Sequence, residues 1–542
     1  MALKTFAAVS IGSAVTEMKI FEFTQRRSMR EIECISTRIN LGLDVYEQGR
    51  ISREHIDELC DVLNDFKRTM SGYRVSAYRV FATSAFRESR NRTILCDYIE
   101  KQTGLEIEVF TNAEQRFVDY QAIASTSEEF AAIIQNATAI VDISGSSTQI
   151  SLFDKDKLIT TQNIRVGNIT TRENLLPLAK NGEHFEKLVR ELMAYELAGF
   201  AKLYQKDRKI RNLIVLGGSL NEMMPMKNFL ELQEQSAFIS KKDTAEATDT
   251  GTKKDTASDI RIPSLTKEQF ERIYKDMIAQ TPEEIAAKYD LPSDMTDAIV
   301  PSAIICRSLI ENFDVDVVWM PGFSLNDGVS YDYGVRMGLV TRRHSFDEDI
   351  LAAARSIAKR YKTSQSHIRN ISDIAVQIFD RMKKVHGLGE HERLLLQIAV
   401  ILHSCGKFIS LTDISDCAYN IILATEIIGL SQKDRAIVAY TVKYNTSPFI
   451  YYEELSGRTD LSAREYMIVG KLTAILRVAN SLDRTHHQKC SNITVTLKEH
   501  ELKISVASQQ DLSLERGAFN EKVDFFEEMF NVRPVLKQKK TF

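Results

Sequence analysis

Two short turns rich in glycine and serine each follow an apolar stretch of the chain. The first is Gly12-Ser13, after an apolar run that ends at Ile11, and the second covers residues 144–148, after the apolar run 137–143. Small side chains in such a turn let an anion approach the backbone N–H groups, so amides and hydroxyls can hold a phosphate. One turn alone is weak evidence, because such a turn usually just closes a hairpin, but two matched turns favour phosphate binding.

A third transition of the same kind supports this interpretation. The apolar residues 214–216 lead directly into Gly217-Gly218-Ser219. Three such turns would surround one anion if the fold brings their strands together. The residues of these turns that we expect to contact phosphate are Gly12, Ser13, Gly145, Ser146, Ser147, Thr148, Gly217 and Gly218.

The turns must be held by strands, and the surrounding patterns predict an α/β layer architecture. Residues 5–23 indicate a hairpin, because the apolar run before Gly12 is followed by rough alternation of apolar and polar residues. Residues 74–82 and 106–110 also have strand patterns, with a helical segment at 91–101 between them. Residues 137–154 repeat the order of strand, turn and strand, which suggests a duplicated domain.

From about residue 343 helix signals dominate the chain. Apolar residues recur at three- and four-residue steps in 368–382, and 474–482 has the same pattern. Residues 493–506 alternate as a hairpin, and residues 519–530 predict one closing amphipathic helix. We therefore expect a helical domain followed by a small α+β unit.

Length and composition limit the class of protein. The chain has 542 residues, more than one hydrophobic core normally holds, and a formal net charge of −4 from 70 Lys and Arg against 74 Asp and Glu. This balance argues against whole-chain disorder and against a dedicated nucleic-acid coat. The seven cysteines include no CxxC pair, which favours a reducing cytoplasm over a disulfide framework or a zinc ribbon. With neither a signal peptide nor a long apolar run in view, we expect a cytoplasmic protein without a membrane span.

The order and spacing of the motifs resemble the Ppx/GppA family of exopolyphosphatases and guanosine pentaphosphate phosphohydrolases. Residues 82–87, ATSAFR, match its A-T-S-A-x-R motif, and residues 142–149, DISGSSTQ, match its second phosphate loop, D-I-G-G-G-S-T-E. Residues 10–15 match its first loop, D-I-G-S-N-S, and residues 112–116 loosely match its G-x-E-E-A-R segment. The resemblance spans nearly the whole chain outside residues 236–262.

The resemblance implies an α/β fold of two duplicated actin/hexokinase-like (ribonuclease H-like) lobes, followed by an all-α HD-like domain and a small α+β C-terminal unit. The Ser, Thr, Asp and Lys content of residues 236–262 predicts a mobile insertion in the second lobe. The predicted boundaries are 1–130 for the first lobe, 131–342 for the second lobe, 343–485 for the helical domain and 486–542 for the C-terminal unit.

The resemblance also implies a hydrolase that releases terminal phosphate from inorganic polyphosphate or guanosine pentaphosphate. Glu114 would be the general base for the attacking water, Asp142 would hold magnesium, and Arg87 and Thr83 would bind phosphate oxygens. Each charged residue also has an ordinary structural explanation, as an acid at a helix start, a cap on a turn or a surface ion pair. We expect a homodimer, as is common for long family members, and neither specific nucleic acid nor a membrane as a partner.

Two positions near the expected metal depart from the family pattern. Ser10 stands where the family has Asp, and Gln149 stands where it has a metal-binding Glu. Because phosphoryl transfer relies on charge compensation and positioning, both losses predict weaker magnesium binding and a lower rate.

The helical half lacks metal carboxylates as well. The positions that match an HD metal site are His367, His403-Ser404 and Asn480, so both acidic ligands are missing. We expect this domain to shape a channel for a polyanion rather than to catalyse. Its basic contacts would come from Arg477, Arg484, His486, His487 and Lys489, unless these residues form an ordinary solvated face.

Two alternatives to an active hydrolase stay open. The first is a catalytically weak or inactive regulatory protein of the same fold that binds polyphosphate or a nucleotide, which the departures at Ser10, Gln149, Ser404 and Asn480 favour. The second is an ATP-dependent sugar kinase of the same superfamily. It is disfavoured because the ATSAxR and HD-like segments do not belong to kinases.

Overall fold

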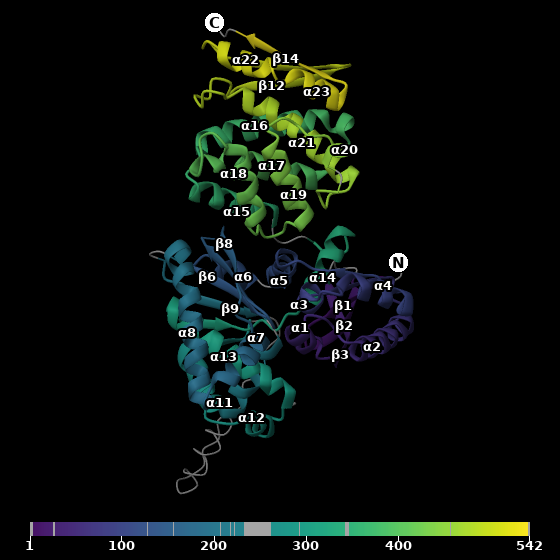
Figure 1. The fold of residues 1–542 in the computed structure, drawn as a ribbon, viewed down its shortest axis with the longest axis vertical. Coiled ribbons are helices and arrows are strands. Elements are labelled where there is room, and N and C mark those ends of the chain that lie inside the picture. The colour runs from purple at the N-terminus through teal and green to yellow at the C-terminus, as the bar shows by residue number, and fades with distance from the viewer. Residues whose placement is uncertain are drawn as a thin grey trace, which may run out of the picture. The chain divides into compact units, whose positions relative to one another are not determined.

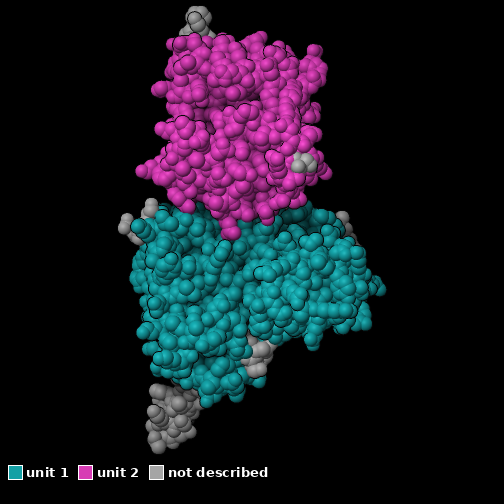
Figure 2. Space-filling model, in the orientation of Figure 1, with its two compact units in different colours: residues 1–345 teal, residues 346–542 magenta. Residues whose placement is uncertain are grey.

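The computed structural model describes most of the chain in two compact units, residues 1–345 and 346–542 (Figure 2). Gly217 and the predicted mobile insertion, apart from Ile262, lie outside the described residues. The described residues are 4–24, 28–126, 128–155, 157–205, 208–216, 218–221, 223–231, 262–291, 293–341, 346–455 and 457–539.

Unit 1 contains two mixed sheets with a matching strand order (Figure 1). In the order β3-β2-β1-β4-β5, the first three strands form an antiparallel meander and β4 and β5 run parallel to β1. In the order β10-β11-β9-β6-β7-β8, the meander is β6, β7 and β8, and β9 and β11 run parallel to β6. The repeated topology confirms the predicted duplication. The strands are β1 Lys4–Ile11, β2 Val15–Phe23, β3 Met29–Arg38, β4 Ala77–Ala82, β5 Ile107–Val109, β6 Thr138–Ile143, β7 Thr148–Asp154, β8 Lys157–Ile164, β9 Asn212–Leu216, β10 Ser264–Thr266 and β11 Val317–Trp319.

Helices cover both faces of the first sheet. Because successive strand residues point to opposite faces, Val9 packs with Leu63 under α1, α2 and α4, while Phe6 packs with Val118 and Val329 under α5 and α14. The segment of α14 falls in the range predicted for the second lobe, yet this helix packs against the first sheet. The helices are α1 Leu41–Gln48, α2 Arg53–Gly72, α3 Ser84–Glu88, α4 Arg92–Thr103, α5 Asn112–Thr126 and α14 Leu325–Arg336.

The helix α5 also reaches the second sheet, so it lies between the two lobes (Figure 1). Its Tyr120 ring packs against Phe153 of β7, with 5.1 Å between the ring centroids. The opposite face of this sheet is covered chiefly by α8, α11 and α13. Further α-helices of unit 1 are α6 Glu128–Ile133, α7 Asn168–Leu175, α8 Gly182–Phe200, α9 Gly218–Asn221, α11 Lys267–Ile278, α12 Pro282–Tyr289 and α13 Ser293–Phe313.

Unit 2 consists of a helical bundle and a three-stranded sheet of order β12-β13-β14. The predicted apolar periodicity is realised in α16 and α21, whose Ile371 and Leu472 are completely buried. No helix among the described residues is both long enough and apolar enough to cross a membrane. The elements are α15 Phe346–Arg360, α16 Gln365–His386, α17 Glu390–Leu402, a 3-10 helix Cys405–Phe408, α18 Ile414–Ala424, α19 Gln432–Lys443, α20 Tyr452–Leu455, α21 Ala463–Ser481, β12 Ile493–Lys498, β13 Glu501–Ala507, α22 Ser513–Asn520, α23 Val523–Phe530 and β14 Arg533–Lys539.

Two features of the C-terminal unit differ from the prediction. The prediction of a single closing helix over residues 519–530 is wrong, because α22 ends at Asn520 and α23 begins at Val523. Gly517 and Asn520 are weak helix formers just before this break. The strand β14 was not predicted, because Pro534 and several basic residues obscure its alternation; it is an edge strand, where proline is tolerated.

Candidate functional site

The first small-residue turn and the ATSAFR segment meet at the carboxyl ends of the parallel strands β1 and β4. The hydroxyl oxygens of Ser13 and Ser84 are 2.7 Å apart. The backbone N–H of Thr83 donates to the carbonyl of Ile11 at 3.0 Å, and the buried Thr83 hydroxyl points to the same carbonyl. A Cβ atom on Gly12 would lie 2.7 Å from a backbone oxygen across the turn, so only glycine fits this close approach.

The second small-residue turn packs against the start of α7. The carbonyl of Gly145 accepts hydrogen bonds from the N–H groups of Ile169 and Thr170, each at 3.0 Å. A Cβ atom on Gly167 would lie 2.4 Å from the backbone of this turn, which explains the glycine there. The buried hydroxyl of Thr148 donates to the carbonyl of Val166 at 2.6 Å, so this predicted phosphate ligand makes a structural hydrogen bond.

One tyrosine touches both turns. The hydroxyl of Tyr46 in α1 lies 3.2 Å from Ser13 Oγ, and a Cβ atom on Gly145 would lie 2.9 Å from the same hydroxyl. Burial raises the pKa of Tyr46, although hydrogen bonds to Ser13 and Ser84 oppose the shift. Sequence reasoning missed Tyr46, because it stands in a helix outside every motif and only the tertiary fold brings it to the turns.

A cavity of about 590 Å³ opens between the two lobes beside these turns. Two guanidinium groups, from Arg87 and Arg165, face it together with hydroxyl and amide side chains, while Glu88 is the only carboxylate of its lining. Such a lining favours an anion. The lining residues are Arg87, Glu88, Asn112, Ser146, Ser147, Asn163, Arg165, Thr170, Thr171, Asn174, Leu175 and Leu192.

Hydrogen bonds hold the charged groups of this cavity in place. Arg87 donates to the carbonyl of Phe110 at 3.0 Å and to the side-chain oxygen of Gln115 at 3.4 Å. The Ser146 hydroxyl donates to the Glu88 carboxylate from the opposite lobe. The Arg87 guanidinium is therefore oriented by the start of α5, and the two lobes are joined at the edge of the cavity.

The carboxylate of Glu114 caps α5. Its Oε2 accepts hydrogen bonds from the backbone N–H of Thr111 at 2.8 Å and from the Thr111 hydroxyl at 2.7 Å. The N–H of Glu114 lies 3.2 Å from the Thr111 hydroxyl, which completes the reciprocal pattern of a capping box. Glu114 is not among the residues that line the cavity, although Asn112 of the same turn is.

Asp142 lies deeper, at the end of β6. Its Oδ2 accepts a hydrogen bond from Gln115 Nε2 at 2.9 Å. Burial raises the pKa of Asp142 to about 6, against this hydrogen bond and the positive charges of Arg87 and Arg116. Burial and the charge of Asp142 raise the pKa of Asp119 well above its ordinary value. The two carboxyl groups line a narrow cavity of about 10 Å³, which has room for about one water molecule.

The donors around Asp142 do not fit a resident magnesium ion. Gln149, which also lines the narrow cavity, is buried and neutral, and neither of its amide atoms has a hydrogen-bond partner among the described residues. Those residues contain no group of three or more His, Cys, Asp or Glu side chains that could hold a metal ion. Magnesium needs near-octahedral oxygen coordination and is often held by one or two carboxylates plus substrate phosphates. A magnesium role for Asp142 therefore stays a prediction that depends on phosphate oxygens.

The predicted phosphate residues fall into three groups. Arg87, Ser146 and Ser147 line the cavity. Gly12, Ser13, Thr83, Gly145 and Thr148 build the supporting turns without lining it, and Gly218 begins α9. Five further lining residues were not among the predicted ligands, although Asn112 stands in the segment 112–116 that resembles a family motif. They are Asn112, Asn163, Arg165, Thr170 and Thr171.

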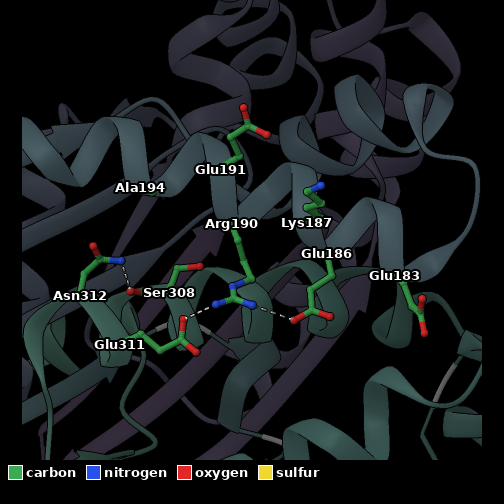
Figure 3. Close-up of a pocket in the computed structure, with 9 residues that line it drawn as sticks. All are labelled: Glu183, Glu186, Lys187, Arg190, Glu191, Ala194, Ser308, Glu311 and Asn312. Atoms are coloured by element: carbon green, nitrogen blue, oxygen red, sulfur yellow. Dashed lines mark hydrogen bonds and ion pairs between the residues drawn. The ribbon is translucent and has the colours of Figure 1, made fainter.

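A second hollow of unit 1 lies between α8 and α13, away from the motifs (Figure 3). Four of its lining residues are glutamates, and its Arg190 lies 2.8 Å from Glu311 and 3.9 Å from Glu186. Because acids outnumber bases and the arginine is already paired, this surface is unsuited to a phosphate ligand.

In unit 2 the two histidines at HD-like positions are buried and belong to one network. His367 Nδ1 lies 2.8 Å from Asp483 Oδ2, and His367 Nε2 lies 3.3 Å from His403 Nε2. Burial and the charge of His367 lower the pKa of His403 to about 3. The acid that meets these histidines is Asp483, whereas motif spacing alone had pointed to Asn480.

Two of the basic residues predicted to contact a polyanion already bind other groups within unit 2. Arg477 donates to the carbonyls of Tyr444 and Ser447, both at 2.6 Å. Lys489 pairs with the buried Glu515 at 3.2 Å. Neither side chain is therefore free to bind a polyanion, whereas Arg484 and His487 are exposed.

The chain matches known proteins along most of its length. The Ppx/GppA phosphatase family matches residues 20–335, and domain III of the Ppx/GppA phosphatases matches residues 351–521. The chain is 20% identical over 476 residues to a guanosine-5'-triphosphate,3'-diphosphate pyrophosphatase of Aeromonas hydrophila, covering 88% of this chain and 86% of that protein. It is 19% identical over 508 residues to a protein of the same name from Aliivibrio fischeri, covering 91% and 89%.

A solved exopolyphosphatase structure from Cytophaga hutchinsonii is similar in fold, with a TM-score of 0.51 at 17% identity over 62% of this chain and 100% of that one. The matches confirm the predicted family, its duplicated lobes and the prediction of a phosphatase-type hydrolase. The chain belongs to the Ppx/GppA phosphatase family.

Proposed function

We propose that this protein hydrolyses the terminal phosphoric anhydride of inorganic polyphosphate or guanosine pentaphosphate in the cavity between the two lobes of unit 1. The observation that carries the proposal is the lining of that cavity, where Arg87 and Arg165 face the hydroxyls of Ser146 and Ser147. Guanidinium groups bind phosphate oxygens through paired N–H donors, and hydroxyls add neutral donors beside them. The substrate classes follow from the names of the similar proteins.

Each side of the cavity would have its own task. Arg87, oriented by the Phe110 carbonyl, would hold the phosphate at the first lobe, while Arg165 would hold it at the second lobe. Positioning and charge compensation of this kind supply most of the catalysis in phosphoryl transfer. Magnesium, when it enters with the substrate, would neutralise phosphate charge. We assign no resident ion, because the donors around Asp142 do not fit one.

Two carboxylates compete for the role of general base. Glu114 is the one that the family resemblance implies, but its Oε2 already accepts two hydrogen bonds from Thr111. Glu88 lines the cavity directly and accepts a hydrogen bond from Ser146. A base must lie within hydrogen-bonding reach of the attacking water, so Glu114 would act only if one carboxylate oxygen faces the substrate.

Phosphate release from long-chain polyphosphate and from guanosine pentaphosphate, with magnesium present, tests the proposal. We expect wild-type turnover and a loss of at least about a hundredfold in Glu114→Gln, since general-base catalysis contributes about 10²–10⁴-fold. Glutamine also serves at the third position of a capping box, so this variant should unfold at the wild-type temperature. Glu114→Ala, which removes the cap as well, separates the two roles through its lower thermal midpoint.

Glu88→Gln is the matched comparison. If the loss appears in Glu88→Gln and not in Glu114→Gln, the base is Glu88 and the role implied for Glu114 is wrong. In either case Arg87→Ala and Arg165→Ala should lower kcat as well as raise KM, because both arginines would stabilise the charge of the transition state. Release that is unaffected by either arginine would place the reaction outside this cavity.

The second candidate function is a binding protein with little or no turnover. Its specific support is the neutral Gln149 beside Asp119 and Asp142, and the lack of a metal-holding cluster among the described residues. Equilibrium binding of the same two substrates distinguishes this candidate. Tight binding without phosphate release, with both arginine variants weakened, would replace the hydrolase by a sensor of polyphosphate or nucleotide.

A further inference from the structure

A hollow of about 410 Å³ opens in unit 2 beside the buried histidines. It lies where the turn after α15 and the start of α16 approach the helix Cys405–Phe408 and the segment after α21. Pockets of this size suit small ligands. The lining residues are Tyr361, Lys362, Thr363, Ser364, Ser404, Lys407, Phe408 and His486.

Positive charge gathers at this hollow without a neighbouring acid on its wall. Lys362 and Lys407 line it, and no carboxylate does. Burial and the charge of Arg484 lower the pKa of Lys407, while burial and the charges of His367 and Lys407 lower the pKa of His486 to about 4. Because these groups repel one another, a bound anion would stabilise them. The hydroxyls of the serine and threonine residues in the lining supply further donors.

The wall behind the hollow is fixed by a chain of hydrogen bonds. His403 Nδ1 donates to the Val400 carbonyl at 2.7 Å, which leaves His403 Nε2 as an acceptor. His367 Nε2 lies 3.3 Å from that acceptor, while His367 Nδ1 faces the Asp483 carboxylate at 2.8 Å. The ring of His367 is therefore held from both sides, by the Asp483 carboxylate and by the His403 ring.

This paired histidine supports a residue of the lining. The ring of His486 stacks on His367, with 3.6 Å between centroids and 5° between the ring planes. His486 has φ = 58° and Lys362 has φ = 51°, so both lining residues adopt the left-handed conformation that non-glycine residues rarely take. They adopt it in the turns that follow α15 and α21, and both turns contribute to the lining of the hollow.

Aromatic rings form the remaining side. The rings of Tyr361 and Phe408 meet edge to face, 5.7 Å apart, and the Phe408 side chain is 55% exposed. An exposed ring next to a group of cations is a surface on which a nucleobase can stack while its phosphates are bound.

We propose that unit 2 binds a nucleoside phosphate in this hollow, with the phosphates on Lys362, Lys407 and His486 and the base against Phe408. The site shares no lining residue with the cavity of unit 1.

Calorimetric titration of the full chain with GDP and with inorganic pyrophosphate tests the proposal. The titrations use an Arg87→Glu, Arg165→Glu background, which removes the arginines of the unit 1 cavity and therefore assigns any remaining binding to another site. In that background we expect one GDP per chain. Lys407→Glu should weaken both probes at least about tenfold, because it turns an attraction into a repulsion. Phe408→Ala should weaken GDP about tenfold and pyrophosphate less than twofold, since stacking acts only on the base.

Lys498→Glu is the matched control, because it makes the same charge change on the exposed face of β12, outside the hollow. It should leave both affinities unchanged. Lys407 and Phe408 are exposed, so their variants should also unfold at the same temperature as the double-arginine background protein. The absence of GDP binding in the background protein, or equal losses in Lys498→Glu and Lys407→Glu, would overturn the proposal. GDP affinity that Phe408→Ala leaves unchanged would overturn the nucleoside part and leave a phosphate site.

Discussion

At the scale of single residues, the pair Asp119 and Asp142 makes the stability of unit 1 depend on pH. The folded protein raises the pKa of Asp142 from 3.8 to about 6, chiefly through burial. Because the folded state holds this proton more tightly than the unfolded state, the group's contribution to stability is fully present below about pH 4. That contribution is lost as the pH rises from about 4 through about 6. The loss for one group is up to about 3 kcal/mol.

We therefore expect Asp119→Asn to stabilise the protein at pH 7 and to have little effect at pH 4. Removing one of the two acids relieves their repulsion only where they are ionised. Urea unfolding of wild type and variant at both pH values measures the difference. A variant that is destabilised equally at the two pH values would show that Asp119 acts through a hydrogen bond rather than through charge.

A second residue-scale prediction concerns Gln149, which stands where the family resemblance implies a metal-binding Glu. Gln149→Glu adds a third carboxylate to the buried pair, so we expect it to lower the free energy of unfolding at pH 7 by about 2–4 kcal/mol without metal. Millimolar magnesium should recover more stability in this variant than in wild type. Thermal unfolding with EDTA and with magnesium measures both effects.

Gln149→Leu is the control for that experiment. Because the Gln149 amide has no partner among the described residues, an apolar side chain of similar size should be neutral or stabilising. A Leu variant as unstable as the Glu variant would mean that packing, and not charge, explains the loss.

At the scale of elements, the close crossing of α5 and α14 holds the first lobe together. A Cβ atom on Gly328 of α14 would lie 2.2 Å from the backbone carbonyl oxygen of Val118 in α5. We expect Gly328→Ala to destabilise unit 1 by several kcal/mol, because the helices must move apart and open their shared core. Gly199→Ala is the control, since nothing lies within 4 Å of its Cβ position in α8 and alanine favours a helix by about 1 kcal/mol. Chemical unfolding of both variants gives the comparison, and equal effects would contradict the crossing argument.

The same crossing shows what sequence patterns predict well and what they do not. Apolar runs that end in small residues correctly predicted β1 with its turn at Gly12 and β6 with its turn at Gly145, because alternation and turn chemistry act locally. That α14 returns to the first sheet is decided by tertiary packing of Val329 against Phe6, which no local pattern encodes. The strand β14 was missed for a related reason, since an edge strand tolerates Pro534 and charged residues.

The candidate site divides in the same way. Arg87, Ser146 and Ser147 stand in motifs and line the cavity, so their residue types and spacing were sufficient to find them. Asp119 and Tyr46 were missed, because each gains its position from helix packing and neither belongs to a phosphate turn. Asp483 was missed by three positions, since motif spacing pointed to Asn480 while the helix end places the acid beside His367.

At the scale of the whole molecule, each unit has its own buried core. In unit 2, Ile371 of α16, Leu396 of α17 and Leu472 of α21 are completely buried, and Ile504 of β13 is buried in the same unit. A core of this kind in a chain of roughly 200 residues is sufficient for independent folding. We therefore expect residues 346–542, produced alone, to unfold in one cooperative transition and to give dispersed amide signals in an NMR spectrum.

Activity should separate along the same boundary. Arg87, Arg165 and both candidate bases lie in residues 1–345, so this fragment should release phosphate from guanosine pentaphosphate with a kcat within about tenfold of the full chain. The fragment 346–542 should release none. As a control for damage by truncation, the 1–345 fragment should unfold at the same temperature as unit 1 does in the full chain. A folded but inactive 1–345 fragment would show that residues of unit 2 take part in the reaction, and the proposed reaction site would then have to be extended beyond the cavity of unit 1.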